Sequence, residues 1–61
     1  MKNTLKVIEQ GTLESGYDYI IIERTYFRGV AITEYIAYVD RVNATFKDLD
    51  DAKAFAEDYR A

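Results

Sequence analysis

The sequence lacks cysteine and histidine altogether, and its only serine is Ser15. Without cysteine the chain cannot form disulfides, and without cysteine and histidine it cannot build the usual zinc sites. Ser15 falls in a predicted turn with no base nearby to activate its hydroxyl, which almost excludes nucleophilic catalysis. We therefore expect a protein that is not an enzyme and that holds no metal and no cofactor.

The lack of covalent or metal cross-links also limits how the chain can be stabilised. Its 61 residues make a single domain, residues 1–61, close to the smallest size that folds unaided. Apolar residues make up 49% of the chain, which is ample for a core and argues against disorder. Either this core is very well packed, or a second chain contributes to it.

Long apolar runs are also missing from the sequence. No run approaches the length that spans a bilayer, and Met1–Thr4 is not followed by the apolar core of a signal peptide. We therefore expect a cytoplasmic protein that does not associate with membranes.

The chain has fewer basic than acidic residues, and the excess of acids is unevenly distributed along the sequence. The net charge is −3, yet acids and bases balance through residue 30, so the whole deficit lies in the C-terminal half. A phosphate backbone calls for a basic footprint, which makes nucleic acid an unlikely partner for this chain. The acidity favours a protein partner with a basic surface.

The segment from Tyr17 to Val39 organises the chain. It predicts two long β-strands joined by a tight turn at Phe27-Arg28-Gly29. The run Ile20-Ile21-Ile22 favours a strand because β-branched side chains fit the pleated surface best. Gly29 supplies the position where a positive φ costs little, so we expect a three-residue hairpin loop that ends on this glycine.

The length of this loop decides which residues of the two strands face each other. A three-residue loop would place Tyr26 opposite Val30 and Ile22 opposite Glu34. A two-residue loop would instead place Glu23 opposite Glu34, and like charges directly opposite each other destabilise a sheet. We therefore expect the first register.

The N-terminal segment predicts a further strand. Leu5 and Val7 alternate with Lys6 in Thr4–Glu9, which is typical of a half-buried strand. An isolated glycine in a strand often marks a bulge, so Gly11 is the expected site of one. The pattern leaves open whether the chain here is one bent strand or two pieces.

The C-terminal segment predicts a short strand end at Ala44–Phe46 and then a helix. Asp48 is a natural N-cap, and Asp50 and Asp51 fall in the first turn, where the helix dipole favours acids. The apolar stripe expected at helical spacing comprises Leu49, Ala52, Phe55, Ala56 and Tyr59. The predicted fold class is α+β, an antiparallel three- to four-stranded sheet with one C-terminal helix packed on one face.

Both faces of the predicted hairpin are apolar, but one short helix can cover only one of them. If the helix covers the aliphatic face, the outward residues are Tyr17, Tyr19, Ile21, Tyr35 and Val39. Such a patch would mark an interaction site, since tyrosine is enriched at interface hot spots. In the alternative, this second face is the core, and Ala31 and Ala37 make room for the helix.

Two pairs of neighbouring acids lie on the predicted helix, Asp50 with Asp51 and Glu57 with Asp58. Acid–base catalysis needs two carboxylates in a cleft with separated pKa values, which adjacent residues on a solvated helix do not provide. The spacing also lacks the central glycine and the distal glutamate of a calcium-binding loop. These acids are therefore interpreted as helix-capping and solvent-facing groups that can meet a basic partner.

Two resemblances extend this interpretation. Residues 44–55, a strand end at Phe46 followed by an amphipathic helix, resemble the tail of the arm-site-binding N-terminal domain of tyrosine recombinases and of the related plant ethylene-responsive domain. That resemblance implies a DNA-binding module whose sheet enters the major groove. In size, acidity and lack of catalytic residues the chain also resembles phage-encoded inhibitors, anti-CRISPR proteins among them, which implies a protein that occludes a nucleic-acid-binding surface of a host complex.

The leading hypothesis is a small acidic protein-binding module without enzymatic activity, of the phage-inhibitor type. Its expected partner-binding residues are Tyr17, Tyr19, Ile21, Tyr35, Val39, Asp50, Asp51, Glu57 and Asp58. The alternatives are a DNA-binding module of the recombinase-arm type and a homodimer whose sheet faces or edges pair.

Overall fold

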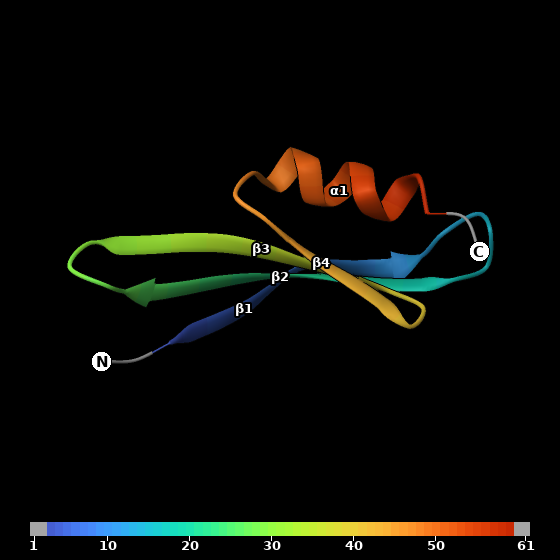
Figure 1. Cartoon of the computed structure of the whole chain (residues 1–61). Coiled ribbons are helices and arrows are strands. Elements are labelled where there is room, and N and C mark those ends of the chain that lie inside the picture. Colours follow the sequence, from blue (N-terminus) through green and yellow to red (C-terminus); the bar gives the residue numbers. More distant parts are fainter. Residues whose placement is uncertain (1–2, 60–61) are drawn as a thin grey trace.

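A computed structural model describes residues 3–59 of the chain. It confirms the expected α+β fold and fixes the number of strands at four (Figure 1). The elements in chain order are β1 (Thr4–Thr12), β2 (Asp18–Phe27), β3 (Ala31–Val39), β4 (Val42–Phe46) and α1 (Leu49–Glu57).

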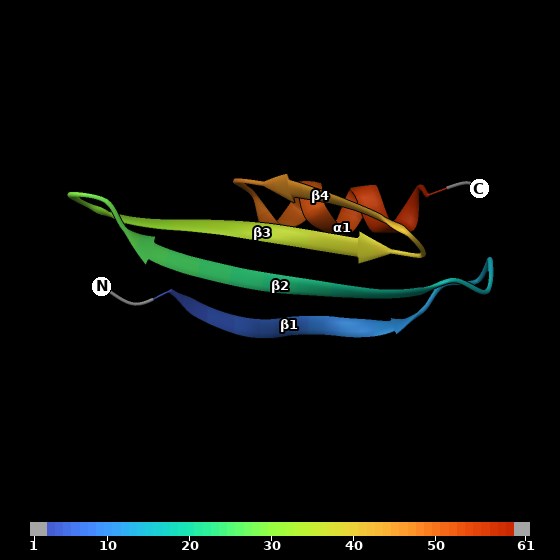
Figure 2. The same cartoon turned by 60° about the horizontal axis from the view of Figure 1, so that its bottom comes forward.

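The four strands form one antiparallel sheet in the order β1-β2-β3-β4, so each strand pairs with its neighbour in sequence (Figure 2). The helix α1 lies on one face of this sheet and packs mainly over β3 and β4. The molecule is elongated, measuring 40 by 16 by 15 Å. The tip of the β2–β3 hairpin extends well beyond the end of the helix (Figure 1).

The hairpin register differs by two residues from the predicted one. Phe27 pairs with Ala31, so the loop is Arg28-Gly29-Val30, with Gly29 in its middle at a φ of 77°. This register places Arg24 opposite Glu34, where the two side chains form an ion pair. The predicted register would have left the charge of Glu34 opposite an isoleucine. Because a shift of two residues keeps each side chain on its face, the predicted composition of the two faces is unaffected.

The strand β1 is continuous, which answers the question that the sequence left open, but its bulge is not at Gly11. Val7 pairs with Ile22 and Glu9 with Ile21, so the extra residue is Ile8. Gly11 instead stays in the ladder, where the ring of Tyr19 lies so close that a Cβ atom on Gly11 would sit 3.4 Å from it. This glycine makes room for an aromatic ring and does not mark a bulge.

The helix begins after Asp48, as predicted, with Asp50 and Asp51 in its first turn. Asp48 has the extended backbone of an N-cap residue, although its side chain makes no capping hydrogen bond. At the other end of the helix, the Tyr59 hydroxyl donates a hydrogen bond of 3.2 Å to Asp40 in the β3–β4 turn. This contact links the end of α1 to the sheet.

The core lies between α1 and the sheet. Ile21, Ala37 and Ala52 are fully buried and contact one another as its centre. Val39 and Ala56 extend this buried layer. Burying a side chain the size of isoleucine contributes roughly 1.5–3 kcal/mol, so these few residues provide much of the stability of so small a domain.

Candidate interaction surfaces

The helix covers the tyrosine-bearing face of the hairpin, so the outward placement expected for that face is wrong. Ile21 and Val39 have no exposed surface, and Tyr19 and Tyr35 are half-buried against the core. The reason is steric, because Ala37 presents only a methyl group at the centre of this face and lets the helix approach closely. The alternative in which this face is the core therefore describes the molecule, and Ile21 and Val39 have no exposed surface to offer a partner.

Tyr17, the fifth residue expected on the outward patch, lies just before β2 and is half-buried. Its ring packs edge-on against Tyr59, with the ring centroids 5.2 Å apart. This pair closes the end of the core beside the C-terminal end of α1. Tyr17 therefore contributes to the packing of the helix on the sheet.

The tyrosine hydroxyls at the margin of the covered face are bound to carboxylates of the same chain. The Tyr19 hydroxyl donates a hydrogen bond of 2.6 Å to Glu9, and the Lys53 ammonium lies 3.5 Å from the same carboxylate. The hydrogen bond from Tyr19 lowers the pKa of Glu9, and the nearby Lys53 charge adds to this effect. The same hydrogen bond raises the pKa of Tyr19.

Tyr35 makes a comparable but longer contact. Its hydroxyl donates to Glu23 across 3.4 Å, and the partial burial of the ring, together with that carboxylate, raises the pKa of Tyr35. Internal partners thus occupy the hydroxyls of Tyr19 and Tyr35. These polar groups hold the covered face together at its edges.

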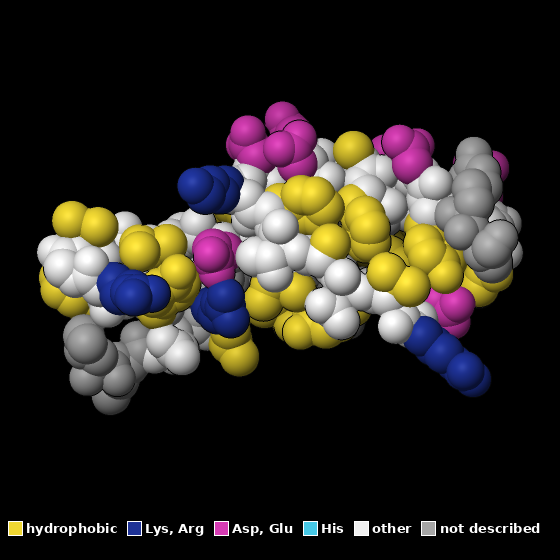
Figure 3. Space-filling view, viewed as in Figure 1, with side chains coloured by type: hydrophobic (Ala, Val, Ile, Leu, Met, Phe, Trp, Pro, Cys, Tyr) yellow, Lys and Arg dark blue, Asp and Glu magenta, His cyan; other side chains and the backbone are white. Residues whose placement is uncertain are grey.

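The acids predicted on the helix lie where the sequence placed them. Asp50, Asp51, Glu57 and Asp58 are all exposed, and we call this set the acidic helix surface. Figure 3 shows acidic side chains gathered along the outer side of α1. Residues 47–58 contain five carboxylates and two lysines, a net charge of −3 that equals the charge of the whole chain.

The face of the sheet opposite α1 has no helix over it, and we call it the open sheet face. Its apolar side chains are Leu5, Val7, Ile20, Ile22, Tyr26, Ile32, Ile36 and Tyr38, of which Ile36 is only 8% exposed. Leu5 is 64% exposed and Val7 50%, which corrects the expectation that they point inward. Their alternation with Lys6 does mark a strand, but the covered side of β1 is the side that carries Lys6.

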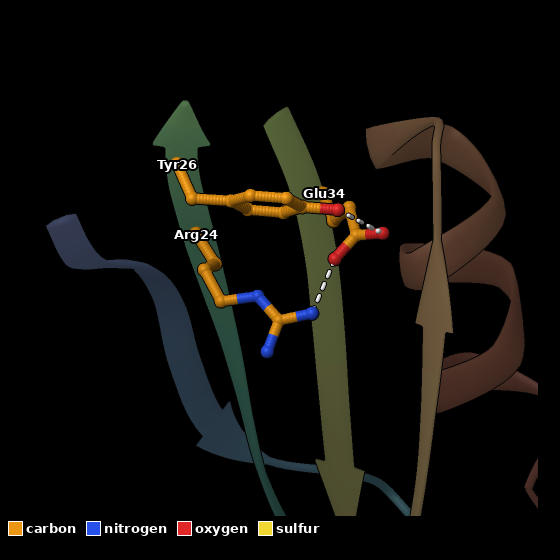
Figure 4. Close-up of polar contacts among 3 residues, drawn as sticks. All are labelled: Arg24, Tyr26 and Glu34. Carbon is orange, nitrogen blue, oxygen red and sulfur yellow. Dashed lines mark hydrogen bonds and ion pairs between the residues drawn. The ribbon is translucent and has the colours of Figure 1, made fainter. Parts of the chain in front are cut away.

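A polar cluster lies on the open sheet face toward the hairpin tip (Figure 4). Arg24 on β2 donates to Glu34 on β3, and Tyr26 donates to the other oxygen of the same carboxylate across 3.5 Å. The Arg24 guanidinium also lies 5.5 Å from the centre of the Tyr26 ring, within cation–π range. The two charges of this cluster therefore neutralise each other locally.

The hollows of the surface offer little for chemistry. One hollow lies between the β1–β2 turn and the C-terminal end of α1, and its lining includes Ser15, Tyr19 and Glu57. Within residues 3–59, no three acidic side chains are grouped so that they could hold a metal ion. Over the same residues, no helix combines the length and apolar character needed to cross a bilayer.

Comparison of the chain with protein-family models, with curated proteins and with solved structures found no match. The two surfaces above are therefore interpreted from their own composition and geometry.

Proposed function

We propose that this chain is a non-enzymatic binding module that docks through the acidic helix surface onto a basic surface of another protein. The observation that supports this best is the concentration of charge. Residues 47–58 hold the entire net charge of the chain, while the remaining residues are balanced in acids and bases. The molecule therefore has one strongly acidic segment, and the acids and bases of its remaining residues balance.

The position of these acids favours a role outside the fold. None of the four residues of the acidic helix surface has a resolved hydrogen bond or ion pair with another described side chain, and all four are exposed. Glu57 and Asp58 lie at the C-terminal end of α1, where the helix dipole disfavours negative charge. Their charges thus oppose the stability of the helix, whereas a field of one sign speeds encounter with an oppositely charged partner.

Basic protein surfaces commonly bind nucleic acids, because phosphates require lysine and arginine. A module that covers such a surface would act as an inhibitor by competing with the nucleic acid. The resemblance to small phage-encoded inhibitors suggests this form of the proposal. The cytoplasmic location suggested by the sequence stays a prediction.

The test is a comparison of immobilised variants that capture proteins from a cell lysate. The double variants Glu57→Gln/Asp58→Asn and Asp50→Asn/Asp51→Asn should each lose most of what the wild type retains at low salt. The matched control, Glu14→Gln/Asp18→Asn, removes two exposed charges that lie outside α1, in and beside the β1–β2 turn, and should retain the same proteins. Equal capture by all four proteins would contradict the proposal.

The captured proteins should also bind duplex DNA, and adding the chain should displace that DNA. Wild-type protein should achieve half-displacement at a concentration at least about ten-fold lower than Glu57→Gln/Asp58→Asn, which corresponds to about 1.4 kcal/mol of binding free energy. Captured proteins that do not bind nucleic acid would leave the docking proposal standing but contradict the inhibitor form.

The DNA-binding alternative would use the open sheet face, since in the recombinase-arm resemblance the sheet enters the groove. Here Arg24, one of the cations near that face, is already paired with Glu34. We therefore expect no shift of random duplex DNA by the chain in a gel at low salt. A salt-sensitive shift that the Arg24→Gln variant loses would favour the alternative instead.

A further inference from the structure

The apolar side chains of the open sheet face are arranged in rows across the strands. Val7 pairs with Ile22, which pairs with Ile36, so three strands contribute to one continuous row. The adjacent row passes through Ile20 and Tyr38. Because paired residues on one face lie about 5 Å apart, these two rows form a contiguous apolar surface.

The solvent-exposed area of the chain is larger than that expected for a monomer of its mass. A monomer of 7.1 kDa exposes about 4,100 Å² by the usual scaling with mass. This chain exposes 4578 Å², and the open sheet face contributes Val7 at 50% exposure and Tyr38 at 40%. A sheet with an apolar face normally buries that face against another layer, and in one copy of this chain the open sheet face lacks such a layer.

Charge favours a second copy of the chain as that missing layer. The two apolar rows contain no charged residue, and the charge surplus lies on the opposite side of the molecule, on the acidic helix surface. Two copies can therefore bring their open faces together while their acidic surfaces point away from each other. Arg24 and Glu34, which lie on the same face, already form an ion pair within one copy and together add no net charge to the contact.

The area of the open sheet face is also sufficient for an interface between two copies. The strands have nine, ten, nine and five residues, and at about 4.8 Å between strands and about 3.3 Å per residue they give a face of roughly 520 Å². Pairing two such faces covers roughly 1,000 Å², which lies at the lower limit for a specific interface. We propose that two copies of this chain pack their open sheet faces together as a β-sandwich, with α1 of each copy on the outside.

This dimer goes beyond the proposed function because it uses a different surface. It would present two acidic helix surfaces on opposite sides, so that one dimer could engage two basic sites. It also covers the second face of the sheet in a small domain that has no cysteine to form a disulfide.

The test is sedimentation equilibrium of the whole chain over a range from about 1 to 100 μM. The wild type should show twice the mass of one chain at the upper end of this range. Val7→Lys and Tyr38→Lys, each with native-like circular dichroism, should raise the dissociation constant at least about a hundred-fold, because each buries a charge in the pair. Val7 and Tyr38 are already half exposed in one copy, so both variants should fold.

The matched control is Val30→Lys at the hairpin tip, where the replaced valine is 65% exposed and lies outside the two rows. It should dimerise like the wild type. A wild type that stays monomeric at the highest concentration would overturn the proposal. A dimer that Val7→Lys and Tyr38→Lys leave intact would overturn it as well, because the copies would then be paired through an edge such as β1.

The two proposals can fail separately. Glu57→Gln/Asp58→Asn should leave the dimer intact. Val7→Lys should still capture basic proteins, but it should lose any increase in capture that comes from having two acidic helix surfaces on one dimer. Loss of capture with an intact dimer would therefore count against the acidic surface alone, and the reverse result against the open face alone.

Discussion

The two faces of the sheet are both apolar, yet only one of them is the core. Ile21 on the covered face is fully buried, while its neighbours in sequence, Ile20 and Ile22, lie on the open face and are only partly buried. The two faces differ in the size of the side chains at their centres. The covered face has Ala37 and Ala44 paired there, whereas the open face has Ile36 and Tyr38.

The helix shows the same preference for small residues at its contact. Its two buried residues are Ala52 and Ala56, which face the sheet. With methyl groups on both sides, the helix and sheet axes can approach closely and the larger rings, Phe46 and Phe55, fill the flank with their centroids 5.5 Å apart. Space for the helix, more than hydrophobicity, therefore decides which face becomes the core.

The most direct test of the difference between the two faces is to remove the same side chain from each of them. Ile21→Ala should lower the free energy of unfolding by about 2–5 kcal/mol, because it opens a cavity in a fully buried site. Ile20→Ala removes identical atoms one residue earlier and should cost less than about half as much. Urea denaturation at low protein concentration, where self-association contributes little, measures both.

Equal losses for the two variants would show that the open face is as well packed as the covered one. A loss for Ile20→Ala that grows with protein concentration, while that of Ile21→Ala stays constant, would place Ile20 in the dimer contact.

A second test enlarges a small residue at the contact of the helix with the sheet. Ala52→Leu should destabilise the chain by about 1–3 kcal/mol, because the buried methyl group leaves no room for three more carbons. Ala54→Leu is the control on the exposed side of the same helix. Alanine and leucine have similar helix propensities, so the control should change the free energy of unfolding by less than about 0.5 kcal/mol. An Ala52→Leu variant as stable as the wild type would contradict the argument from space.

The smallest expected effect concerns the polar margin of the covered face. The folded state lowers the pKa of Glu9, so its carboxylate stabilises the fold above the ordinary glutamate pKa of about 4.3. That stabilisation should be lost as the pH falls through the lower, folded value. Tyr19→Phe removes the hydrogen bond that is the largest cause of this shift.

Urea denaturation between about pH 7 and pH 3 measures the difference in unfolding free energy between the wild type and Tyr19→Phe. This difference should be greatest near neutral pH and should narrow below about pH 4. A difference that does not change with pH would mean that Tyr19 acts through its ring alone.

Much of the fold follows from local patterns in the sequence. The isoleucine run of β2, the start of α1 after Asp48 and the acids of its first turn follow from β-propensity, capping and the helix dipole, which depend on neighbouring residues. The alternation of the two long strands also assigns their side chains to the correct two faces of the sheet. These features are local, and the structure contains them.

Long-range contacts explain the parts that the sequence did not predict. The hairpin register depends on the pairing of Arg24 with Glu34. This pairing is favoured over the predicted register, in which the hairpin loop would end at Gly29. The choice of the covered face depends on the fit of Ala52 against Ala37, two elements apart in the chain. Of the expected partner-binding residues, the four acids are exposed because solvated charge needs no partner, whereas the five apolar ones required knowledge of that fit.

The bulge at Ile8 has a consequence for how this protein meets other chains. β1 is an outer strand, and its free edge offers unpaired backbone groups to any extended segment nearby. Because Ile8 interrupts the regular spacing midway along it, a foreign strand could form an unbroken ladder with only about half of this edge. The inserted residue thereby limits the length of ladder that another strand can form along this edge.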